Sequence, residues 1–210
     1  MMVEGALELL FDMDWMFLVG TAAFSLSGYL LGVKKQFDLL GILIVSLLTA
    51  IGGGIIRDVL LNRIPIVFHD ASALWVIVAT LLIAWGASLH KVYSPGMHRL
   101  FIVADSIGLI AFSLAGAQVG LHYGLNLFGV LFIGFVSAVG GGIVRDMMVN
   151  DVPFILHKDF YGTVSILVAA LLYGATVLRW DGPWLVWGLF CLGLTIRLVA
   201  HYRDFKLPRV

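Results

Sequence analysis

The chain has 210 residues, of which 61% are hydrophobic and 12% are charged, and its formal net charge is zero. A soluble globular domain is closer to half apolar and a quarter charged, so this composition excludes a soluble domain and indicates an integral membrane protein. The balanced charge gives no reason to expect a nucleic-acid partner, and membrane lipid is the expected surrounding.

Seven apolar runs predict seven transmembrane helices in an all-α membrane protein. In chain order, the predicted helices span about residues 15–33, 39–61, 71–89, 100–121, 127–149, 161–178 and 184–201. Pro65 and Pro153 follow the second and fifth runs, and proline cannot continue a helix. We expect residues 1–210 to form a single transmembrane domain.

The first six predicted helices form two sequence repeats. Gly52 matches Gly140 at an offset of 88 residues, from position 52 to position 140. The same offset, without a gap, pairs Gly20 with Gly108, Phe24-Ser25-Leu26 with Phe112-Ser113-Leu114, Asn62 with Asn150, Pro65 with Pro153 and Gly86 with Gly174. The repeats cover about residues 15–90 and 99–178, and the seventh helix, about 184–201, has no counterpart. Because each repeat holds three spans, an odd number, the two repeats must be inverted, as is common in transport proteins.

Basic residues in the predicted loops indicate the orientation. If the N-terminus lies outside, the outer segments hold only Arg63 and Arg179. The inner segments then hold Lys34, Lys35, Lys91, Arg99, Lys158, Arg197, Arg203, Lys206 and Arg209. We therefore expect a multi-pass protein of the inner (plasma) membrane, with its N-terminus outside and its C-terminus in the cytoplasm.

The second and fifth runs each contain the motif Gly-Gly-Gly-x-x-Arg-Asp. Its copies are Gly52, Gly53, Gly54, Arg57 and Asp58, and Gly140, Gly141, Gly142, Arg145 and Asp146. Glycine destabilises a helix by roughly 1 kcal/mol relative to alanine, and a charged pair at membrane depth is also unfavourable. We therefore expect both helices to be interrupted or kinked, so that free carbonyl oxygens line an ion path. The alternative is that the glycines let two helices pack closely.

The charges of the motif are expected at the two mouths of this path, Arg57-Asp58 outside and Arg145-Asp146 inside. Adjacent residues on a helix do not face each other, so each arginine needs a carboxylate from elsewhere. Asp105 is the candidate for Arg145, and Asp14 or Asp70 for Arg57. For conduction of cations, each arginine has to be neutralised by a nearby carboxylate, which is Asp58, Asp14 or Asp70 outside and Asp146 or Asp105 inside.

Six hydroxyl residues in the apolar runs could line the path. They are Ser25, Ser27, Thr49, Ser106, Ser113 and Ser137. The alternative is that they bond the backbone of their own helices, as such hydroxyls commonly do. The six histidines predict no metal site, and we find no nucleophile–base arrangement, Walker loop or zinc spacing. We therefore expect neither an enzyme nor a cofactor.

The doubled motif, in two three-span repeats followed by a seventh span, resembles the prokaryotic trimeric intracellular cation (TRIC) channels, which are also labelled a glycine-transporter family. The resemblance covers roughly residues 15–201. It implies a homotrimer with one pore inside each protomer, formed largely by the second and fifth helices, and passive conduction of K⁺ and Na⁺. Animal members carry a different, lysine-bearing motif and bind an inositol lipid there, so lipid regulation is not implied for this chain.

A second class of function is compatible with the same pattern. Inverted repeats and broken helices suit a carrier that moves a small amino acid by alternating access as well as they suit a channel.

Overall fold

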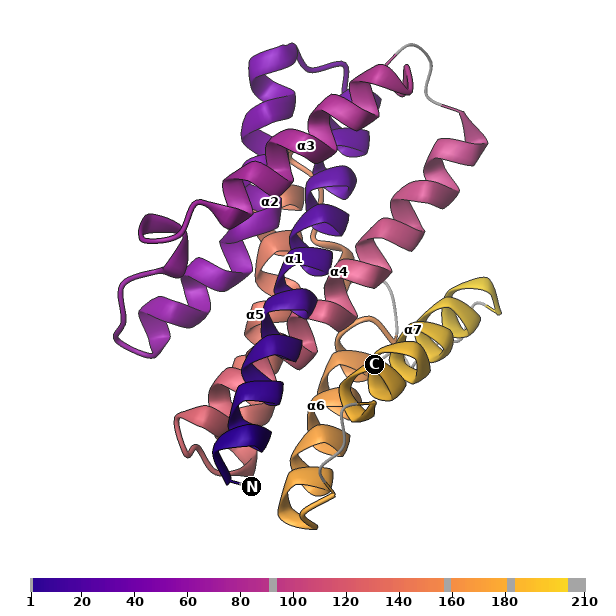
Figure 1. Cartoon of the computed structure of the whole chain (residues 1–210). Coiled ribbons are helices and arrows are strands. Elements are labelled where there is room, and N and C mark those ends of the chain that lie inside the picture. The colour runs from indigo at the N-terminus through magenta and orange to yellow at the C-terminus, as the bar shows by residue number, and fades with distance from the viewer. Residues whose placement is uncertain (1, 91–93, 157–159, 181–183, 204–210) are drawn as a thin grey trace.

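The computed structural model describes residues 2–90, 94–156, 160–180 and 184–203, with side chains from residue 15 onward. Within these residues all regular structure is helical (Figure 1). The helices are α1 (Met2–Lys34), α2 (Leu39–Leu60), η1 (Ile66–Phe68), α3 (Ser72–Gly86), α4 (Pro95–His122), α5 (Leu127–Met148), η2 (Phe154–Leu156), α6 (Gly162–Val177) and α7 (Leu185–Tyr202). The predicted all-α class with seven transmembrane helices is confirmed. Of these, α3 and α6 are the short ones, with 15 and 16 residues.

The two repeats have the same local structure at matching positions. Helices α2 and α5 both have 22 residues and begin and end at paired positions. Their N-cap side chains, Asp38 and Asn126, accept hydrogen bonds from the amides of Gly41 and Gly129. These caps satisfy amides that have no partner within the helix. Helix α1 packs on α2 and α3 as α4 packs on α5 and α6. The fold is therefore two inverted three-helix repeats with α7 added.

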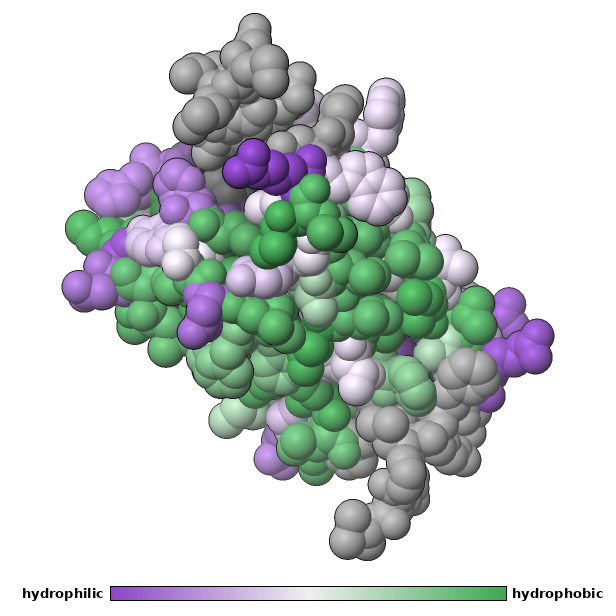
Figure 2. All heavy atoms as spheres, turned by 90° about the horizontal axis from the view of Figure 1, so that it is seen from below, coloured by the Kyte–Doolittle hydropathy of each residue, from purple (hydrophilic) through white to green (hydrophobic). Residues whose placement is uncertain are grey.

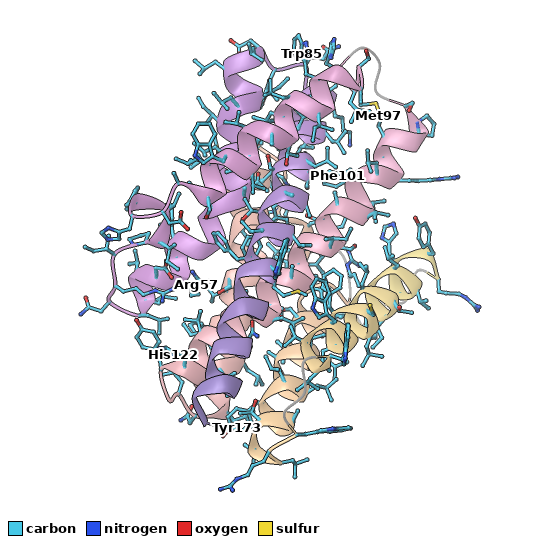
Figure 3. All side chains as sticks on the ribbon, viewed as in Figure 1. Arg57, Trp85, Met97, Phe101, His122 and Tyr173 are labelled. Atoms are coloured by element: carbon cyan, nitrogen blue, oxygen red, sulfur yellow. The ribbon has the colours of Figure 1, made fainter. Side chains whose placement is uncertain are left out.

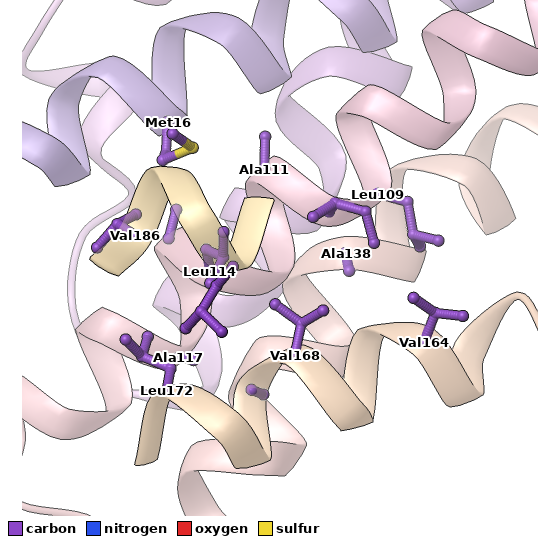
Figure 4. Close-up of a cluster of buried hydrophobic side chains, with 14 of the residues drawn as sticks. Met16, Leu109, Ala111, Leu114, Ala117, Ala138, Val164, Val168, Leu172 and Val186 are labelled. Carbon is purple, nitrogen blue, oxygen red and sulfur yellow. The ribbon is translucent and has the colours of Figure 1, made fainter. Parts of the chain in front are cut away.

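The repeats are joined through α1 against α4 and α2 against α5, while α7 packs on α4 and α6 (Figure 1). Helix α4 is the most enclosed of the five long apolar helices, because 83% of its 18-residue apolar stretch is buried inside the protein. The main apolar cluster draws side chains from five helices (Figure 4), among them Met16, Leu109, Leu114, Ala138, Val164, Val168 and Val186. This core holds the second repeat and α7 together around α4.

Large apolar side chains also cover the outside of the bundle (Figure 2). Examples are Trp75, Leu82 and Ile83 on α3 and Phe128 on α5, which are at least two-thirds exposed. Such a surface suits lipid rather than water. The polar groups that could serve a function therefore have to be sought inside the bundle.

Candidate functional site

The glycine triples bring α2 and α5 into backbone contact. Helical structure continues through both triples, so neither Gly52–Gly54 nor Gly140–Gly142 interrupts its helix, and the kink that was the other form of the prediction stays a prediction. A Cβ atom at Gly53 would lie 2.2 Å from the carbonyl oxygen of Ser137, and one at Gly141 would lie 2.1 Å from that of Thr49. No side chain fits at either position without moving a helix. Close packing, the alternative raised by the sequence, describes the triples correctly.

The third glycine of each triple has a different role. A Cβ atom at Gly54 would lie 3.8 Å from Nη2 of Arg57, and one at Gly142 would lie 3.8 Å from Nη2 of Arg145. Each guanidinium therefore folds back over the glycine that lies three residues earlier. Glycine at these two positions leaves room for the buried guanidinium group of the arginine beside the contact between the two helices.

Arg145 is fully buried and bonded to three helices. Its Nη1 donates to Asp105 on α4 over 2.6 Å and to the hydroxyl of Ser27 on α1. Its Nε donates to Asp146 over 2.8 Å. Its Cζ lies 4.9 Å from the ring centroid of Phe101, a cation–π distance. The expected pairing of Arg145 with Asp105 is present.

Two further residues belong to this second-repeat site. Tyr161, which precedes α6, is buried and lies 4.9 Å from the Cζ atom of Arg197 on α7, measured to the ring centroid. Arg197 was predicted to lie in an inner segment, and Tyr161 was not predicted to be a site residue. The signal for Arg197 was a charged residue within the seventh apolar run, which usually marks a buried polar site.

Arg57, like Arg145, is bonded to the carboxylate of the residue that follows it, Asp58. Arg57 Nε donates to Asp58 Oδ1 over 2.7 Å, and Arg63 Nη2 donates to the same oxygen over 2.6 Å. The amide of Ile66 donates to Asp58 Oδ2 over 3.1 Å. One carboxylate thus serves two guanidinium groups. Figure 3 places Arg57 well away from Phe101, so the two arginine sites are separate.

Of the acidic residues predicted to neutralise Arg57, Asp58 does so, whereas Asp70 is bonded elsewhere. Asp70 instead accepts hydrogen bonds from the amide and hydroxyl of Ser72, over 2.9 and 2.7 Å. The side chain of Asp14 lies outside the described residues. Adjacent residues pair in both motifs because the arginine side chain is long enough for its Nε to reach the neighbouring carboxylate. The expectation that adjacent residues on a helix do not face each other describes the directions of their Cβ atoms, and a long side chain can still reach its neighbour.

A pocket of about 230 Å³ lies beside Arg57. It is lined by Phe17, Leu18, Arg57, Ile66, Asp70, Ser72, Ala115 and Val119. The walls are mostly apolar, with the buried arginine on one side and Asp70 with Ser72 on another. None of the six hydroxyl residues predicted to line a path is among these lining residues.

Those six hydroxyl residues are all buried, and their contacts divide them. Thr49 and Ser137 donate to the carbonyl groups of Val45 and Ile133 on their own helices. Ser113 donates to the carbonyl of Ser165 over 2.7 Å. The hydroxyls of Ser25 and Ser106 have no partner among the described residues. Only Ser27 joins an arginine site.

A family model described as "Glycine transporter" matches the chain twice, over residues 14–88 and 102–176. A "UPF0126 membrane protein" of Deinococcus radiodurans is 40% identical over 73% of this chain and 71% of its own length. The "UPF0126 inner membrane protein YadS" of Escherichia coli K12 is 30% identical over 92% of this chain and 94% of its own length.

Two solved structures share the fold. One, described as a prokaryotic TRIC channel in 0.5 M KCl, has a TM-score of 0.85 at 26% identity and covers 93% of this chain and 98% of its own. The other, from work on conductance through TRIC cation channels, has a TM-score of 0.77 at 32% identity and covers 94% of this chain and 96% of its own.

Proposed function

The chain belongs to the glycine transporter family and resembles the prokaryotic TRIC channels in sequence and fold, and from this premise we propose that it is a channel for the monovalent cations K⁺ and Na⁺. It is a single transmembrane domain that forms a homotrimer in the inner membrane, with one pore in each protomer. It needs no cofactor and catalyses no reaction. The ion path runs along the α2–α5 contact, on the side that carries Arg57 and Arg145.

One observation carries the proposal: each buried arginine is paired with a carboxylate. The Nε–Oδ1 distances are 2.7 Å for Arg57–Asp58 and 2.8 Å for Arg145–Asp146, and Asp105 adds a second carboxylate at the latter. At an effective dielectric constant near 20, a unit charge about 4 Å away contributes roughly 4 kcal/mol, which is enough to decide which ions enter. Neutralised arginines leave backbone and hydroxyl oxygens to set cation preference.

The test is a planar-bilayer recording of the purified protein in a KCl gradient. The reversal potential of the wild type is expected to indicate cations. Asp105→Asn and Asp146→Asn expose the charge of Arg145 and are expected to lower cation current. Asp38→Asn, which changes only an exposed N-cap with a similar capping group, is the matched control. Anion preference in the wild type would contradict the proposal.

The orientation is part of the proposal, since it rests on the loop charges alone. Single cysteines are placed at Lys35 and at Arg179 in a variant from which Cys191 has been removed. A membrane-impermeant thiol reagent applied to intact cells is expected to label position 179 and not position 35. The reverse pattern would invert the assignment.

A second candidate is a carrier of glycine. The description of the family model favours it, and so does the tight, uninterrupted α2–α5 contact, which does not by itself outline an open pore. Proteoliposomes loaded with the protein would then show saturable uptake of radiolabelled glycine and no single-channel steps. Current steps without such uptake would eliminate the carrier.

A further inference from the structure

The two arginine sites are related by the repeat, and their surroundings can be compared position by position. Arg145 corresponds to Arg57 at the repeat offset. The two residues on other helices that accept hydrogen bonds from Arg145 also have counterparts in the other repeat. Asp105 corresponds to Phe17, and Ser27 corresponds to Ala115. The carboxylate and the hydroxyl that Arg145 Nη1 binds are therefore replaced by a phenyl ring and a methyl group.

Phe17 and Ala115 both line the 230 Å³ pocket beside Arg57. The second repeat thus contains a built-in carboxylate at the place where the first repeat has a pocket. The guanidinium at that pocket is almost completely buried, with 2% exposed. A carboxylate brought in by a ligand could bind Arg57 as the Asp105 carboxylate binds Arg145.

The charges around the pocket favour such a ligand. Arg57 and Arg63 share the carboxylate of Asp58, and Asp70 lines the same pocket, so the formal charges of these four residues balance. A zwitterion keeps this balance, and the charge-assisted bond of its carboxylate to arginine is among the stronger hydrogen bonds in proteins. Among the residues whose side chains are described, Arg57 is therefore bonded to one carboxylate, which it shares with Arg63, whereas Arg145 is bonded to two.

Asp70 supplies the second point of recognition. It lines the same pocket, and its two oxygens are oriented by the amide and hydroxyl of Ser72. The hydrogen bonds from the Ser72 hydroxyl and amide lower the pKa of the Asp70 carboxyl, so it carries a negative charge at neutral pH. A fixed carboxylate at the pocket wall suits an ammonium group.

We propose that the pocket between α1, α2 and α4 binds a small zwitterionic α-amino acid, with Arg57 holding its carboxylate and Asp70 its ammonium group. The apolar walls formed by Phe17, Ala115 and Val119 limit the ligand to a small side chain. The inference does not depend on ion conduction, because binding can be measured without transport.

The test is isothermal titration calorimetry with the full-length protein in lipid nanodiscs, using glycine, acetate and methylammonium as probes. Glycine is expected to bind at least tenfold more tightly than either half-molecule, since each of those offers only one of the two charges. Arg57→Gln is expected to abolish glycine binding. Asp70→Asn is expected to weaken glycine binding by roughly tenfold and to leave acetate binding unchanged.

The double variant Phe17→Asp/Ala115→Ser supplies the ligands of the second repeat at the first. Its new carboxylate is expected to occupy Arg57 and to eliminate glycine binding while the protein stays folded, as judged by its thermal transition. Asp151→Asn, which alters an exposed ion pair with Lys35, is the control and should bind glycine as the wild type does. Equal binding of acetate and glycine, unchanged binding by the double variant, or no heat with millimolar glycine would overturn the proposal. Bilayer recordings of the same preparation assess conduction separately.

Discussion

The two arginine sites share a motif and a backbone, yet they differ in what surrounds the guanidinium. Arg145 is enclosed by Asp105, Ser27 and Asp146 from its own chain. Arg57 has Asp58, which it shares with Arg63, and a pocket. The repeated motif fixes the position of each arginine, whereas single residues on α1 and α4 decide whether its outer face is filled.

The shared part of the comparison is the glycine contact, and breaking it is expected to have the largest effect. Gly53→Ala and Gly141→Ala each place a methyl carbon about 2 Å from a backbone oxygen, which cannot move without shifting a helix. We expect losses on the order of 3 kcal/mol or more of folding free energy, at the upper end for overpacking. Thermal unfolding in detergent measures this.

Another pair of repeat-related glycines provides the control for that experiment. A Cβ atom at Gly86 or at Gly174 has nothing within 4 Å. Replacing either with alanine should be neutral or stabilise the protein by up to about 1 kcal/mol, because alanine restricts the unfolded chain and favours helix. Similar losses from all four substitutions would show that the α2–α5 contact is not special.

The second prediction tests the position at which the two sites differ. Asp105→Asn removes a charge that lies 2.6 Å from buried Arg145, and breaking a buried pair costs about 3–5 kcal/mol. Asp146 remains bonded to Arg145, so we expect a loss near the lower end of that range. At the matching position, Phe17→Leu keeps an apolar side chain and should cost less than about 1.5 kcal/mol. Equal losses would contradict the assigned asymmetry.

The smallest expected effect concerns the partly exposed charged residues that follow α1 and α2, Lys35 and Arg63. Lys35 Nζ lies 2.6 Å from Asp151 Oδ1, with both side chains partly exposed. At the matching positions, Arg63 Cζ lies 5.8 Å from the ring centroid of Tyr123. Lys35→Ala should change the stability by less than about 1 kcal/mol, because exposed ion pairs contribute little. Arg63→Ala should cost more, since it also removes a partner of buried Asp58. Chemical denaturation of both variants ranks them.

Because each apolar run is bounded by polar residues or proline, the sequence predicted most helix ends to within a few residues. The exceptions are the starts of α1 and α4, at Met2 and Pro95, since these helices extend beyond the apolar runs predicted to begin at about 15 and 100. The predicted second and fifth spans, 39–61 and 127–149, each exceed α2 and α5 by one residue. The predicted third span, 71–89, was longer than α3 because its last three residues, Ala87, Ser88 and Leu89, form turns. The 88-residue offset revealed the repeat directly.

The site was predicted less well, because it depends on which helices meet. Asp105 could be assigned to Arg145 from depth alone, since few acidic residues lie within the spans. The role of the triples could not be predicted from the sequence of one helix. Gly53 and Gly141 are required because backbone atoms of the other helix leave no room for a side chain. Arg197 was missed for the same reason, as only the packing of α7 on α6 brings it to Tyr161.

The contact between Gly53 and Ser137 also has a consequence for biosynthesis. During translation α2 enters the membrane three helices before α5. Until α5 is inserted, the side of α2 that carries the glycine triple therefore lacks the helix on which it packs. Contacts between distant parts of a chain form late, and unpaired faces expose a folding intermediate to wrong association. A nascent chain that ends after α3 is therefore expected to be a target for membrane quality control, or to pair through its glycine face with another copy of itself.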